Sequence, residues 1–304
     1  MVNTNGIRIA QDEAFARRLA EYKQGFEVYL QFDSFEPKVL KSMRGADLTR
    51  IRTETLERLN ELDISTTLVV TLKKGENDGE IGKIIDFALT QPCVRGVTLQ
   101  PAQDAGRAEG YEARLNRLTV SEIRRRIAEQ TQAFSLSDII PVPCNPDTLA
   151  MGYALKLGGS VVPLTRFVDP EILVKGESST ITFEHDPETK RRVFELFATN
   201  HSPDGQANCL SELLCCLPKV EAPAALGYKS VFRVLIVQFM DALSLDIRAL
   251  KKSCIHIAQP DGRLIPFESF NLFYRDDKQK VLEALRRNVM KKGSEPIKFG
   301  RRQT

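Results

Sequence analysis

The chain has 304 residues, of which 42% are hydrophobic and 27% charged, a composition typical of a globular protein with one or two domains. Its net charge of +3 is too small to indicate nucleic-acid binding, and no basic stripe is interleaved with aromatic residues. No apolar run approaches the roughly 18 residues that a transmembrane helix needs, and no signal peptide opens the sequence, so we expect a cytoplasmic protein.

The N-terminal part alternates predicted strands and helices. Apolar, β-branched runs predict strands at residues 2–4, 27–32, 66–72 and 95–100, and apolar residues at helical spacing predict helices at 11–24, 48–62 and 81–88. Thr119 and Glu122 form a capping box that opens a further helix, and Asn77–Asp78 is expected to cap the helix before it. This alternation indicates an α/β protein with a parallel sheet, either a barrel or an open sheet; the lack of a GxGxxG motif weakens the dinucleotide-binding option.

The regular alternation of predicted strands and helices ends after residue 138. Residues 141–147 contain three prolines, which mark a boundary, so we predict a first domain at 1–138, an α+β accessory domain at 139–290 and a disordered basic tail at 291–304. Within the accessory domain, helices are predicted at 188–199, 210–216 and 278–290. The segment 231–240 is a buried strand or helix, and Gln259–Gly262 is the turn of a hairpin.

Short motifs occur along the chain in this order: Asn5-Gly6, YLQFDS at 29–34, TLKKGEND at 71–78, GVTLQP at 96–101, PVPC at 141–144, CCLP at 215–218 and PDGRLIPF at 260–267. This ordered set resembles one branch of the radical S-adenosylmethionine (SAM) superfamily, which includes tetraether-lipid synthase and pterin methylase-like proteins. The resemblance implies a partial parallel β/α (TIM-like) barrel, here its later half, followed by an accessory domain.

The resemblance also implies two cofactors, SAM and a 4Fe-4S cluster. The intact enzyme would form a 5′-deoxyadenosyl radical and act on an unactivated carbon of a small-molecule or lipid-like substrate, by C–C coupling or methylation. An electron donor such as ferredoxin or flavodoxin is then expected. The family's cluster is held by cysteines spaced CxxxCxxC, and no such spacing occurs in this sequence. We therefore expect a fragment of a longer enzyme; the alternative is a non-catalytic barrel remnant that binds a ligand or a partner protein.

Four residues at the predicted strand ends are candidates for SAM binding: Gln31, Asp33, Thr71 and Gln100. Ligands meet the carboxyl ends of the strands in a parallel barrel, and the resemblance places these ends against SAM. Asp33 would accept hydrogen bonds from the ribose hydroxyls, and Thr71 and Gln100 would meet the methionine or adenine portion. The alternative is that Gln31 and Gln100 only satisfy loop backbone groups.

The remaining candidates lie outside these strand ends. Arg107 is expected to bind a substrate carboxylate or phosphate, or to form a structural ion pair, and His201 is a weak substrate-binding candidate. Cys209, Cys216 and Cys254 are candidates for holding an auxiliary cluster; the favoured interpretation is that they are buried thiols, as for Cys93.

Overall fold

The computed structural model describes residues 1–104, 111–142, 145–157, 159–166, 228–253, 255–275 and 287. They fall into two compact units, of which unit 1 holds residues 1–102 and 112–239 and unit 2 holds residues 103–111 and 240–304. The boundary predicted at residue 138 therefore lies inside unit 1. The helices predicted at 188–199, 210–216 and 278–290 and the tail at 291–304 lie outside the described residues, apart from the helical residue 287.

Unit 1 begins with the predicted alternation of strands and helices. The four strands are confirmed, and the capping box at Thr119 and Glu122 is present with both of its hydrogen bonds. The elements up to residue 130 are β1 (Val2–Thr4), α1 (Ile7–Gln11), α2 (Glu13–Ala20), the 3-10 turn η1 (Lys23–Gly25), β2 (Val28–Gln31), α3 (Pro37–Arg44), α4 (Thr49–Glu61), β3 (Thr66–Leu72), α5 (Ile81–Thr90), β4 (Val94–Pro101), α6 (Ala113–Asn116) and α7 (Val120–Gln130).

Two helical segments differ from the prediction. The helix predicted at 11–24 is divided into α1 and α2, because Asp12 adopts an extended backbone and its carboxylate accepts a hydrogen bond from Phe15 N at 2.8 Å as the cap of α2. Helix α3 was not predicted, although Pro37 opens it and Gly45 closes it with a φ of +78°. Both are ordinary helix-end residues at these places.

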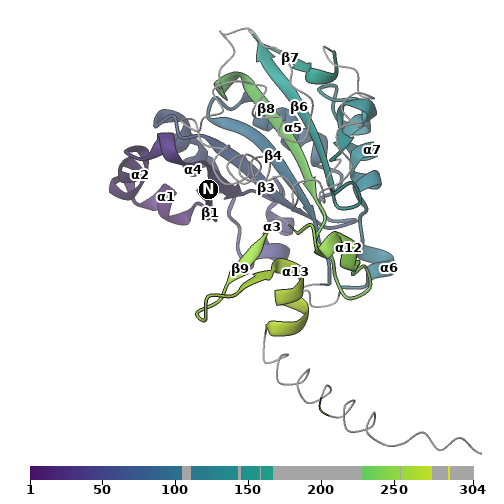
Figure 1. Cartoon of the computed structure of the whole chain (residues 1–304). Helices are drawn as coiled ribbons and strands as arrows, with labels where there is room; N and C mark the ends of the chain where they lie inside the picture. Colours follow the sequence, from purple (N-terminus) through teal and green to yellow (C-terminus); the bar gives the residue numbers. More distant parts are fainter. Residues whose placement is uncertain are drawn as a thin grey trace, which may run out of the picture. The chain divides into compact units, whose positions relative to one another are not determined.

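The strands of unit 1 form one sheet with the order β1-β2-β3-β4-β8-β6-β5. Strands β1 to β4 and β8 run parallel, and β6 runs antiparallel to β8, β5 and β7. Figure 1 shows β4, β8 and β6 side by side in this sheet. The segment 231–237 is thus a strand, and residues beyond 138 extend the parallel sheet. Its later elements are η2 (Leu136–Asp138), β5 (Ile140–Pro141), β6 (Leu149–Leu157), β7 (Ser160–Pro163), η3 (Leu164–Arg166), η4 (Tyr228–Ser230) and β8 (Val231–Val237).

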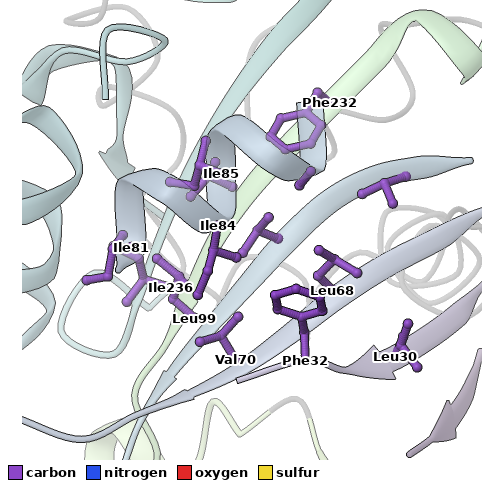
Figure 2. Close-up of a cluster of buried hydrophobic side chains, with 14 of the residues drawn as sticks. Leu30, Phe32, Leu68, Val70, Ile81, Ile84, Ile85, Leu99, Phe232 and Ile236 are labelled. Carbon is purple, nitrogen blue, oxygen red and sulfur yellow. The ribbon is translucent and has the colours of Figure 1, made fainter. Parts of the chain in front are cut away.

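One face of the sheet carries the hydrophobic core. Ile81, Ile84 and Ile85 of α5 are buried in one cluster with Val70 and Leu99 of the strands, and Figure 2 shows Ile84 between the helix and the strands. Helices α4 and α7 contribute further buried side chains to the same cluster. The fold is α/β with a mostly parallel sheet, as in part of a β/α barrel, and within the described residues the sheet is open. Among these residues, no helix combines the length and the apolar character that a bilayer crossing requires.

Unit 2 contains the predicted hairpin. Strands β9 (His256–Ala258) and β10 (Leu264–Pro266) pair antiparallel, and Gly262 has a φ of +83° in the turn between them, a conformation that glycine adopts without steric cost. The other described elements of unit 2 are α12 (Ile247–Leu250), α13 (Phe267–Ser269) and the π-helical turn η5 (Phe270–Tyr274).

Candidate functional site

The carboxyl ends of the five parallel strands meet at one edge of the unit 1 sheet, called here the C-terminal edge. Parallel α/β sheets bind ligands at this edge, because the loops there leave room between the strands and helices. Gln31 ends β2, and Asp33 follows it; Thr71 lies near the end of β3 and Gln100 near the end of β4. The structure therefore places the four predicted SAM-binding residues at the same edge.

The face of the sheet opposite the core is polar near this edge. In β2, β3 and β4, the residues of the core cluster alternate with Tyr29, Gln31, Thr67, Val69, Thr71, Thr98 and Gln100, which form what we call the second face. Thr71 lies opposite Gln100 in the pairing of β3 with β4. Both are half-buried, as is Gln31. Side chains of this kind and exposure are suited to hydrogen bonds with a polar ligand.

Asp33 is the centre of a hydrogen-bonded cluster. Its carboxylate is fully buried, and Oδ1 accepts from Gln31 Nε2 at 2.7 Å, Arg44 Nη2 at 2.9 Å and Thr71 N at 3.0 Å. Oδ2 accepts from Arg44 Nε at 2.8 Å and Arg52 Nη2 at 3.0 Å. Its φ of +63° is uncommon for a residue with a side chain and indicates a conformation held by its surroundings. Asp33 is predicted to accept hydrogen bonds from the ribose hydroxyls of SAM. Its two carboxylate oxygens already accept these five bonds, so a ribose would have to share them.

Arg44 and Arg52, which the sequence analysis did not single out, complete the cluster. Arg44 Nη2 also donates to Thr71 Oγ1 at 3.0 Å, and Arg52 Nε donates to Gln31 O at 3.1 Å. The Arg44 side chain is 32% exposed, whereas that of Arg52 is 3% exposed. Nη1 of Arg52 has no hydrogen-bond partner within the described part of the chain. Two guanidiniums face one carboxylate, so these three side chains together carry a single positive charge, which favours an anionic ligand.

The charges of the cluster explain its pKa shifts. Burial alone would raise the pKa of Asp33, but the hydrogen bonds and charge of Arg44, together with Thr71 N–H and Gln31, hold it below its usual value. Burial lowers the pKa of Arg52 to about 10, although Asp33 acts in the opposite direction. Asp33 and Arg52 therefore both remain ionised near neutral pH.

Asn77 joins the loops that follow β2 and β3. Its amide Nδ2 donates to Asp33 O at 2.9 Å and to Thr71 O at 2.8 Å, and its Oδ1 accepts from Lys73 N at 2.8 Å. Asp78 accepts from Gly75 N at 2.7 Å. The prediction that Asn77–Asp78 caps α5 is wrong, because Glu80 occupies the cap position and no side chain caps the helix there. The two residues instead fix the loop at the C-terminal edge.

A second buried ion pair lies deeper on the second face, away from the C-terminal edge. Arg233 of β8 lies 3.8 Å from the carboxylate of Glu27 and donates to the hydroxyl of Tyr29 at 3.1 Å. Thr67 donates to the same Glu27 carboxylate at 2.6 Å. Arg233 is opposite Gly96 of β4, where a Cβ would lie 2.5 Å from Arg233 O, so glycine permits the close approach of the two strands.

The described residues do not fit an iron–sulfur cluster. No group of three histidine, cysteine or acidic side chains among them could hold a metal ion. The one cysteine described, Cys93, precedes β4 and thus lies at the end of the strand opposite the C-terminal edge, and burial raises the pKa of its thiol to about 11. Arg107, His201, Cys209, Cys216 and Cys254 lie outside the described residues, so their predicted roles stay predictions.

The chain is similar to known proteins at two levels, a family model and a single relative. Residues 1–88 match the family model of the radical SAM superfamily. The chain is 27% identical over 314 aligned residues to the 7,8-dihydro-6-hydroxymethylpterin dimethyltransferase of Methanocaldococcus jannaschii. That alignment covers 90% of this chain and 61% of the relative, so the chain spans less than two thirds of the length of the protein that it matches.

Proposed function

We propose that the chain forms the SAM- and substrate-facing wall of a radical SAM enzyme, because residues 1–88 match the model of this superfamily, whose members use SAM and a 4Fe-4S cluster. The proposed reaction takes a hydrogen atom from an unactivated carbon through a 5′-deoxyadenosyl radical and leads to methylation or C–C coupling. The name of the relative supports a pterin-like small molecule as the substrate. Radical formation consumes one electron, so a donor such as ferredoxin or flavodoxin is part of the proposal.

One observation carries the proposal: Gln31, Asp33, Thr71 and Gln100 gather at the C-terminal edge with a net positive cluster beside them. SAM carries a carboxylate, which a positive group can bind, and a ribose and an adenine, which neutral hydrogen-bonding groups can bind. Gln31, Thr71 and Gln100 supply the neutral groups.

Arg44 is the residue that we assign to the carboxylate of SAM. It is held by Asp33 on one side and Thr71 on the other, and about a third of its side chain remains exposed. A guanidinium fixed in this way binds a carboxylate without losing side-chain freedom, which strengthens the contact. In this proposal Asp33 positions Arg44, and its predicted contact with the ribose becomes secondary.

Calorimetric titration of the 304-residue chain with SAM tests the assignment. We expect Arg44→Ala to weaken SAM binding roughly 10-fold or more, because a hydrogen-bonded charge pair is lost. Arg50→Ala is the matched control, since the Arg50 side chain is 83% exposed and pairs with Glu54 one turn along the same helix. Equal affinity in the Arg44→Ala variant and the wild type would contradict the role of Arg44, and no SAM binding by the wild type would contradict the proposed function.

The absence of a CxxxCxxC motif favours a second candidate, a non-catalytic module that binds a ligand or a partner protein. The two functions predict different iron contents for the protein purified from its native cells: the enzyme should contain iron, and the binding module should not. An enzyme requires cluster ligands from polypeptide outside these residues, so anaerobic purification should then yield the broad absorbance of an iron–sulfur protein and 5′-deoxyadenosine on reduction with SAM. Protein without iron that still binds SAM would support the binding module.

A further inference from the structure

Thr98 lies in the middle of the second face, on a part of it that none of the interactions described above uses. It belongs to β4, opposite Val69 of β3 on one side and Leu235 of β8 on the other. Gln31 lies opposite Val69 in the next strand, and Gln100 is two residues nearer to the C-terminal edge on the same face. The pair of Thr98 and Val69 therefore lies two residues farther from the C-terminal edge than the pair of the predicted SAM-binding residues Gln100 and Thr71.

The hydroxyl of Thr98 is buried without a partner. The residue is 2% exposed, and Oγ1 has no hydrogen bond to any part of the chain that the structure describes. A buried hydroxyl without a partner destabilises a fold, and valine has the same shape without that cost. A threonine at such a place is explained if a bound molecule supplies the missing hydrogen bond.

The neighbours of Thr98 indicate the kind of molecule. Val69 and Leu235 offer apolar surface on either side, while Gln31 and Gln100 offer carboxamides that both donate and accept. Among the described residues, the side chain of Gln100 forms no hydrogen bond, and that of Gln31 uses only its amide nitrogen. A flat ring lies well against the apolar side chains, and ring nitrogens and exocyclic groups at its edge match the polar ones.

We propose that Thr98 is a substrate-positioning residue whose hydroxyl binds the edge of a planar nitrogen heterocycle that lies on the second face. The inference rests on the proposed function, which offers two sources of such a ring, the adenine of SAM and a pterin. Gln31 and Gln100 bind the same ring system from positions nearer to the C-terminal edge.

Thr98→Val tests this directly in the 304-residue chain. Calorimetry would measure the affinity for SAM and, separately, for 7,8-dihydro-6-hydroxymethylpterin, and thermal unfolding would measure the Tm without ligand. We expect Thr98→Val to weaken one of the two ligands roughly 3- to 10-fold and to raise the Tm by roughly 2–4 °C, because the unpartnered hydroxyl is removed. The ligand that is weakened identifies the ring that Thr98 contacts.

Two further variants separate binding from folding. Thr98→Ser keeps the hydroxyl, so its affinity for both ligands should stay near that of the wild type. Thr66→Val is the matched control, because Thr66 is also buried in the sheet but its hydroxyl donates to Ile64 O at 2.9 Å. It should lower the Tm and leave both affinities unchanged.

The outcomes distinguish a failure of the role of Thr98 from a failure of the proposed function. Unchanged affinity of Thr98→Val for both ligands, or a lower Tm than the wild type, would overturn the role of Thr98 while leaving the proposed function intact. If the wild type binds neither SAM nor the pterin, the proposed function fails and the role of Thr98 fails with it.

Discussion

Arg44 binds Asp33 through two parallel hydrogen bonds, from Nε to Oδ2 at 2.8 Å and from Nη2 to Oδ1 at 2.9 Å. The two residues come from different elements, since Asp33 follows β2 and Arg44 ends α3. This bidentate pair fixes the guanidinium at the C-terminal edge, and Arg52 binds the same carboxylate from α4. Asp33 therefore fixes the positions of both arginine side chains at the C-terminal edge.

Replacing Asp33 by asparagine should strongly destabilise unit 1. The substitution keeps the shape but removes the charge that compensates Arg52, whose side chain is 3% exposed, and so leaves a buried guanidinium unpaired. We expect a loss of about 3–5 kcal/mol in the free energy of unfolding, measured by urea denaturation. Asp47→Asn is the control, because Asp47 is exposed and an asparagine can still accept from Thr49 N. A change below about 1 kcal/mol for Asp33→Asn would contradict this account.

The same carboxylate predicts a pH dependence. The pKa of Asp33 is lower in the folded protein than in the unfolded chain, so its stabilising contribution is present above the unfolded value of about 4 and is lost as the pH falls toward the folded value. The difference in unfolding free energy between the wild type and Asp33→Asn should therefore be constant from about pH 5 to 7 and shrink below about pH 4. Denaturation curves at several pH values measure it; a difference that grows as the pH falls would contradict the sign.

Local sequence patterns predict the strands well, because their signals lie within each segment. The run 66–72 is almost entirely apolar or β-branched, and it forms β3 with the predicted bounds. The placement of Gln31, Thr71 and Gln100 at one edge follows from parallel strands alone. These inferences need no knowledge of distant contacts.

The cluster around Asp33 could not be predicted in this way, because its bonds to Arg44, Arg52 and Thr71 join residues 11 to 38 positions apart. Arg44 and Arg52 look like ordinary helix-surface arginines in the sequence. Asn77 was assigned to a helix cap because its position before a helix is typical of one, yet its amide bonds two loops. The continuation of the sheet through β8 and β6 also depends on long-range pairing.

Asn77 provides a test of how the loops at the C-terminal edge are held. Its side chain is buried and forms three hydrogen bonds to backbone groups, so Asn77→Ala should reduce the free energy of unfolding by about 2–4 kcal/mol. Asn77→Asp is the matched variant, because a carboxylate can still accept from Lys73 N but cannot donate to the two carbonyls. It should be at least as destabilising as the alanine, and hydrogen exchange should quicken at residues 33–35 and 71–77 in both variants. Wild-type stability of Asn77→Asp would show that the amide donors contribute little.

Cys93 provides a test of the conclusion that the described residues do not hold the cluster. Its thiol is buried at the start of β4 and its pKa is raised to about 11, so little thiolate is present near neutral pH. Iodoacetamide should leave the Cys93 peptide unlabelled in the folded protein and label it after denaturation, which mass spectrometry of each cysteine peptide would measure. The Cys93→Ala variant should also take up the same amount of iron as the wild type during anaerobic reconstitution. A lower iron content in this variant would place Cys93 among the ligands and contradict the structural assignment.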